Sequence, residues 1–147
     1  MLAVAYIYFD YKDGVSQNIN YIVRSFLKQL LNRSSPAYHQ LKSMYIENEK
    51  VGTDPDPSSF VDLLRYTVAS NIGSVFVVFD ALDECGNEKF RESIITLICQ
   101  LKEAGAKGFC TTHRSGNTTW YIICIADRGS ERGYTELLFQ CPALQWV

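Results

Sequence analysis

The chain of 147 residues lacks the features that mark several protein classes. Its five cysteines form no Cys-x-x-Cys pair, so a zinc site is not expected, and an odd number fits a disulfide framework poorly. No basic run is longer than two residues and the net charge is −2, which gives no reason to expect nucleic acid as a partner. These absences indicate an ordinary globular protein with reduced thiols.

Signals for secretion and for membrane insertion are also missing. No Lys or Arg precedes the apolar run that starts at Met1, and Asp10 ends that run. No stretch reaches the ~18 apolar residues that a membrane helix needs. We therefore expect a cytoplasmic protein that does not associate with membranes.

Short apolar segments predict the strands. They lie at Ala3–Phe9, at Val75–Phe79 and around Phe109. Both of the first two are continuously apolar, and in Ala3–Phe9 this favours a strand covered on both faces, as in a parallel sheet.

Apolar residues at helical spacing predict helices between these strands. The first starts near a capping Ser16, and a weaker one covers Ala37–Asn48. A third is capped by Ser58 or Ser59, and a fourth is stopped by Gly105. Strands that alternate with helices predict an α/β fold with a parallel sheet and right-handed crossovers.

Three carboxylates follow the second predicted strand at once: Asp80, Asp83 and Glu84. Ligands of parallel α/β sheets bind beyond the carboxyl ends of the strands, so Asp80 is placed to hold a hydrated Mg²⁺. A second acid three or four residues later could orient or deprotonate an attacking water. The alternative is that Asp80 favours the turn while Asp83 and Glu84 start the next helix.

The segment VFVVFDALDEC resembles the Walker B segment of NACHT-type NTPases, especially the nephrocystin-like N-terminal domains of fungal repeat proteins. The segments AYIYFDYKD and IVRSFLKQLL are similar to the second core strand of that family and to the helix after it. FCTTHR resembles the sensor strand, although His113 departs from the usual Thr-Ser-Arg ending. The resemblance covers residues 3–114 and implies a partial P-loop NTPase core of three αβα layers.

The resemblance also implies roles for individual residues. Asp80 would be the Mg²⁺ acid, and Asp83 and Glu84 would position the hydrolytic water. Thr112 and Arg114 would contact the nucleotide, with Arg114 sensing the γ-phosphate. The implied cofactors are Mg²⁺ and ATP or GTP, and the implied behaviour is a signalling switch that self-associates.

A phosphate-binding loop of the form Gly-x-x-x-x-Gly-Lys-Ser/Thr should precede the first strand of this chain, and the sequence has none. We therefore expect a fragment that lacks the first strand and the P-loop and does not bind or hydrolyse nucleotide alone. The family places that first strand centrally in the sheet, next to the sensor strand, so the strand near Phe109 should lose its neighbour and become an exposed edge. Residues 115–147 match nothing in the family and form a divergent tail, in which TWYIICIA could add one strand.

Two other functions fit the same residues. One is a non-catalytic interaction module that assembles through an exposed sheet edge and an aromatic-rich tail. The tail aromatics are Trp120, Tyr121, Tyr134, Phe139 and Trp146. The other is an unrelated metal-dependent phosphotransfer or nuclease domain, which would need further acids, lysines or histidines, whereas the histidines are His39 and His113 alone.

Overall fold

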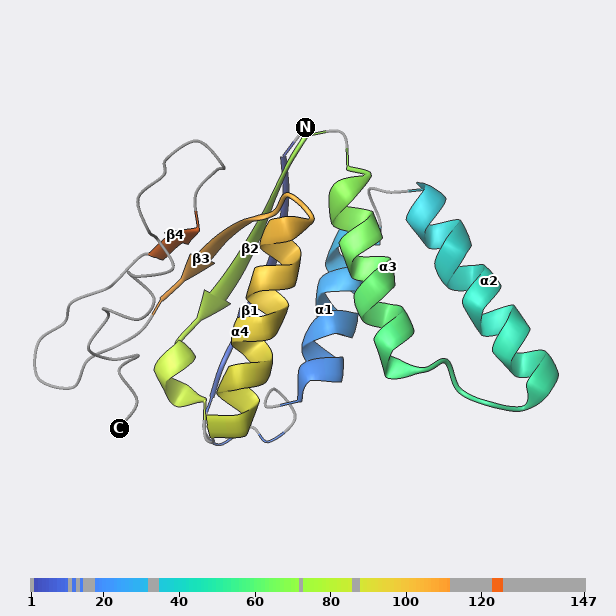
Figure 1. Ribbon diagram of the computed structural model, residues 1–147, viewed down its shortest axis with the longest axis horizontal. Helices are drawn as coiled ribbons and strands as arrows, with labels where there is room; N and C mark the ends of the chain where they lie inside the picture. Colours follow the sequence, from blue (N-terminus) through green and yellow to red (C-terminus); the bar gives the residue numbers. More distant parts are fainter. Residues whose placement is uncertain are drawn as a thin grey trace, which may run out of the picture.

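The protein is built on a mixed sheet with helices packed on one of its faces (Figure 1). The computed structural model describes residues 2–10, 12, 14, 18–31, 35–71, 73–85, 88–111 and 123–125, without the side chains of Asp83, Phe109 and residues 123–125. The strands lie in the order β1 (Leu2–Tyr8), β2 (Ser74–Asp80), β3 (Lys107–Cys110) and β4 (Ile123–Ile125). The helices are α1 (Ile19–Leu31), α2 (Ser35–Val51), α3 (Pro57–Ala69) and α4 (Glu88–Glu103), with a 3₁₀ turn η1 at Leu82–Glu84.

The α/β fold predicted from the sequence is confirmed. Strands β1, β2 and β3 are parallel, with Leu2 level with Ser74 and Phe76 level with Lys107. Together with their helices they form part of an αβα core, of which the described residues supply the sheet and one helical layer. No helix in the described ranges is both long enough and apolar enough to cross a membrane.

The helix boundaries depend on local capping. Asp56, and not Ser58 or Ser59 as predicted, caps α3, because its carboxylate accepts the Ser58 N–H at 2.7 Å. Gly105 ends α4 as predicted: it adopts φ 101°, which permits the Ala106 N–H to bond the Leu101 carbonyl at 2.9 Å. The predicted cap Ser16 lies outside the described residues, and α2 extends beyond the predicted Ala37–Asn48 at both ends.

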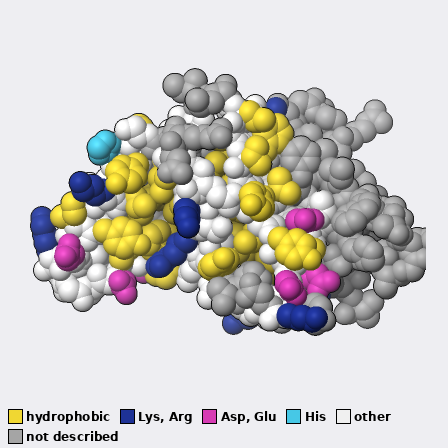
Figure 2. Space-filling view, turned by 180° about the vertical axis from the view of Figure 1, so that it is seen from behind, with side chains coloured by type: hydrophobic (Ala, Val, Ile, Leu, Met, Phe, Trp, Pro, Cys, Tyr) yellow, Lys and Arg dark blue, Asp and Glu magenta, His cyan; other side chains and the backbone are white. Residues whose placement is uncertain are grey.

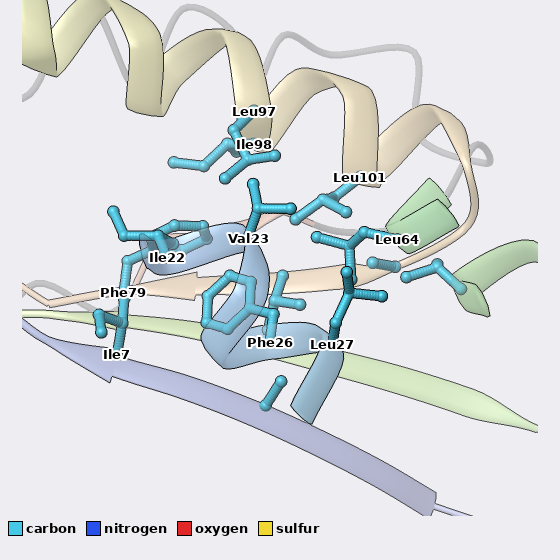
Figure 3. Close-up of a cluster of buried hydrophobic side chains, with 14 of the residues drawn as sticks. Ile7, Ile22, Val23, Phe26, Leu27, Leu64, Phe79, Leu97, Ile98 and Leu101 are labelled. Atoms are coloured by element: carbon cyan, nitrogen blue, oxygen red, sulfur yellow. The ribbon is translucent and has the colours of Figure 1, made fainter. Parts of the chain in front are cut away.

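The core lies between the sheet and helices α1, α3 and α4 (Figure 3). Phe79 of β2 packs edge-on against Phe26 of α1, with the ring centroids 5.3 Å apart. Phe9, just after β1, contacts Phe90 of α4 in the same way at 6.2 Å. Helices α1 and α4 bury an apolar stripe against one face of the sheet, and α3 buries its stripe against α1 and α4, which stabilises this arrangement.

The prediction that β1 is covered on both faces is wrong. Burial alternates strictly along β1, so Ala3, Ala5 and Ile7 are buried while the residues between them are exposed. The crossovers from β1 to β2 and from β2 to β3 advance in the same direction across the sheet. Right-handed connections therefore place all their helices on one side, and the other face of β1 is left to solvent.

The predicted exposed edge at β3 is also wrong. Strand β4 pairs with β3 antiparallel, with Gly108 opposite Ile125 and Cys110 opposite Ile123. The prediction of a further strand within TWYIICIA is confirmed, because Ile123–Ile125 is that strand. The tail thus supplies the hydrogen-bonding neighbour that β3 would otherwise lack.

Candidate functional site

Asp80 lies at the carboxyl end of β2, where the chain leaves the sheet and β3 ends beside it. Its half-buried carboxylate accepts a hydrogen bond from the hydroxyl of Thr111, which directly follows β3. The Thr111 N–H in turn donates to the Phe79 carbonyl at 2.9 Å. The carboxyl ends of two neighbouring parallel strands are therefore joined through one threonine, at the rim where such sheets bind ligands.

Thr111 also fixes the turn that follows Asp80. Its hydroxyl oxygen accepts the Ala81 N–H at 3.0 Å, and its carbonyl accepts the Leu82 N–H at 2.9 Å. Ala81 adopts a left-handed conformation at φ 58° and ψ 48°, which costs roughly 1–2 kcal/mol for a residue with a Cβ. The hydrogen bonds from Thr111 offset this cost and turn the chain sharply away from the sheet.

The acids predicted to handle water lie on the 3₁₀ turn η1. Leu82 and Cys85, at either end of the turn, are buried and anchor it to the core, while Glu84 is half-buried. Arg91 of α4 donates from Nε to the Cys85 carbonyl at 2.9 Å, which ties the turn to the following helix. The acids therefore sit on a backbone held from both sides.

The structure describes only part of the predicted site. Asp80 lies at the rim, at the end of β2, and Asp83 and Glu84 lie on η1. Of Asp83 only the backbone is described. Thr112, His113 and Arg114 also lie outside the described residues.

The sequence predicts a role for Thr112, the second of two adjacent threonines, whereas the residue that bonds Asp80 is Thr111. No signal in the residue order separates the two threonines: Phe79, which is buried, is level with Cys110, and this register places the residue after Cys110 next to Asp80.

The oxygen atoms described at the rim suit Mg²⁺ only when a bound phosphate and waters supply further oxygen ligands. A carboxylate has about four acceptor positions, so the Thr111 bond leaves Asp80 with capacity for a cation or its water. Mg²⁺ is commonly held by one or two carboxylates together with waters and phosphate oxygens. Within the described ranges no group of three or more His, Cys, Asp or Glu side chains could hold a metal alone.

Cys110, next to Thr111, has a titration that can be measured. Burial raises the pKa of its thiol from 9.0 to about 12. Because the thiol holds its proton more tightly in the folded protein, its contribution to stability is fully present below the pKa of the unfolded chain. This contribution is lost as the pH rises from the unfolded pKa toward the folded pKa. Stability should therefore fall above pH 9 by up to about 1.4 kcal/mol per pH unit from this thiol.

Urea unfolding at several pH values, with Cys110→Ala as the reference, isolates this effect because the two proteins share every other titrating group. The stability advantage of the wild type over the variant should shrink by about 2 kcal/mol between roughly pH 9.5 and 11. Two parallel pH curves would contradict the prediction.

Comparison with known proteins gives one family. The family model described as nephrocystin 3, N-terminal, matches residues 2–113, which include both the acidic turn and Thr111. No curated protein and no solved structure matches the chain.

Proposed function

Because the chain belongs to the nephrocystin 3 N-terminal family, we propose that it supplies the Walker B and sensor part of a NACHT-type signalling NTPase module. The observation that supports this proposal is the pairing of Asp80 with Thr111 across the carboxyl ends of β2 and β3. An acid held at this rim by the neighbouring strand is what a phosphate-bound metal requires.

Within this proposal each residue has a distinct task. Asp80 would hold Mg²⁺, which when bound would neutralise charge on the phosphates. Thr111 is a positioning residue, since it orients the Asp80 carboxylate and fixes the turn at Ala81. Asp83 and Glu84 would position the attacking water, and Thr112 and Arg114 would contact the nucleotide.

The 147-residue chain carries no Gly-x-x-x-x-Gly-Lys-Ser/Thr segment. Backbone N–H groups and a lysine from such a loop normally hold the β- and γ-phosphates. We therefore expect the chain alone neither to bind nor to hydrolyse ATP or GTP, and micromolar affinity in a calorimetric titration with Mg²⁺ would overturn this expectation.

A chimera tests the role of Asp80 directly. A strand, P-loop and helix from another family member are fused ahead of residue 2, and the chain is ended at Arg114, where the resemblance to the family ends. This chimera should bind ATP in a Mg²⁺-dependent way, and Asp80→Asn should weaken that binding about tenfold or more, because a metal ligand loses its charge.

Asp62→Asn is the matched control, since Asp62 is an exposed acid on α3 whose ion pair with Arg65 is at the surface. It should leave nucleotide affinity unchanged. If Asp80→Asn and Asp62→Asn bind Mg²⁺–ATP equally well, the proposed metal role of Asp80 is wrong.

We propose as the second candidate a protein-interaction module without catalysis. The observation that favours it is the uncovered face of the parallel sheet, where β1 exposes large apolar side chains. Large contiguous apolar patches on a protein surface mark sites of contact with another molecule.

A further inference from the structure

The face of the sheet turned away from the helices is apolar and exposed. Its exposed side chains come from alternate positions of β1, where between 46% and 63% of each remains accessible: Leu2, Val4, Tyr6 and Tyr8. Phe76 and Val78 of β2, level with Val4 and Tyr6, are half-buried on the same side. Viewed from behind, the molecule shows hydrophobic side chains gathered on this side (Figure 2). We call these six residues the open face.

The open face breaks the usual rule for parallel sheets, which are covered on both faces. Aliphatic and aromatic side chains side by side on two strands form one contiguous surface, not scattered single residues. Tyr6 and Tyr8 add the amphipathic rings that are enriched in protein interfaces. The face is therefore suited to burial against another molecule.

Strand β1 is the outer strand of the described sheet, and its edge is closed to strand pairing at its centre. The side-chain amide of Gln29 on α1 accepts the Tyr6 N–H at 3.0 Å and donates to the Tyr6 carbonyl at 2.9 Å. The same amide nitrogen lies 3.3 Å from the Ser25 hydroxyl, which steadies it. Gln29 thus takes the backbone groups that an added strand would need, so a partner must pack on the face and not along this edge.

The charges around the open face would be complementary between two copies of the chain. Lys107 of β3 lies level with Phe76, its Nζ 5.8 Å from the ring centroid, and Asp80 lies four residues further along β2 on the same face. Consider a second copy related to the first by a two-fold axis that runs across the strands at the level of Tyr6 and Val78. The strands of the second copy then run in the opposite direction to those of the first. Lys107 of one copy then lies level with Asp80 of the other, on adjacent strands.

We infer that the open face is a homodimer interface, in which two copies of this chain pack sheet to sheet with their strands antiparallel. Stacked sheets lie roughly 10 Å apart, so the apolar rows of β1 and β2 would fill the space between them. This inference rests on the second proposed function and does not depend on nucleotide binding.

Sedimentation equilibrium of the full chain from about 1 to about 200 µM tests it. The wild type should form a dimer, and Tyr6→Lys should raise the dimer dissociation constant about 100-fold or more, because it buries a charge at the centre of the face. Val4→Lys should act alike, and circular dichroism should show that both exposed positions tolerate the change. Tyr66→Lys is the control, since Tyr66 is 44% exposed on α3 in the opposite layer.

The outcomes separate the claims. A wild type that stays monomeric overturns both the inference and self-association as a function. If the dimer forms equally well with Tyr6→Lys and Val4→Lys, the open face is not the dimer interface, and the proposal of an interaction module is unaffected. Lys107→Glu should weaken the dimer about tenfold by placing an acid against Asp80, and an unchanged constant would overturn the antiparallel arrangement.

Discussion

Replacing Phe79 with alanine is expected to lower the free energy of unfolding by about 3–5 kcal/mol, enough to unfold much of a domain of ordinary stability. Phe79 is completely buried and packs edge-on against Phe26 in the middle of the core. Both side chains belong to the buried cluster drawn in Figure 3, so the removal of Phe79 leaves a cavity that its rigid neighbours fill poorly. Urea unfolding monitored by circular dichroism measures the loss.

Phe76→Ala is the matched control, because it removes the same side chain from the same strand on the other face. Phe76 is half-buried in the single chain, so its loss should cost the monomer less than about 1.5 kcal/mol. Equal losses in the two variants would mean that both faces of β2 are packed alike, and would contradict the one-sided core described above.

Thr111→Val is expected to destabilise the protein by about 1–3 kcal/mol, although valine has almost the same shape as threonine. The substitution removes a donor to the Asp80 carboxylate and the acceptor of the Ala81 N–H in one step. Ala81 then keeps its left-handed strain without the bond that offsets it. Thermal or urea unfolding of the purified variant reports the change.

Thr111→Ser keeps the hydroxyl and should recover most of the stability lost in Thr111→Val. A serine variant as unstable as the valine variant would show that the γ-methyl group, and not the hydroxyl, matters at this position. Thr96→Val gives a second comparison, since Thr96 bonds only within α4 to the Glu92 carbonyl at 2.9 Å, and its loss should cost less than about 0.5 kcal/mol.

The helices were the most predictable part of the protein. Apolar residues three and four apart place the buried stripes of α1 and α4 without reference to the rest of the chain; on α4 these residues are Phe90, Ile94, Leu97, Ile98 and Leu101, and all of them are buried. Capping was less predictable: Asp56 and Ser58 both suit the start of α3, and only the backbone path makes Asp56 the acceptor.

The candidate site divides in a similar way. A strand that ends in Asp80 and is followed by acids could be located from residue order alone, because strand ends define the binding rim of a parallel sheet. The partner of Asp80 could not, since Thr111 reaches it from 31 residues away through the pairing of β2 with β3. Residue order gave two threonines and no means of choosing between them.

By itself, the sequence determined the α/β class, the apolar stripes of the helices, the position of the acidic turn and the family, because each depends only on local spacing and residue type. Only the tertiary structure decided that β1 has one bare face, that β4 closes the edge of β3 and that Gln29 closes the edge of β1. A continuously apolar strand has the same sequence pattern whether one of its faces or both are covered. Which side is covered depends on the direction in which successive crossovers advance, a property of the whole chain and not of any segment.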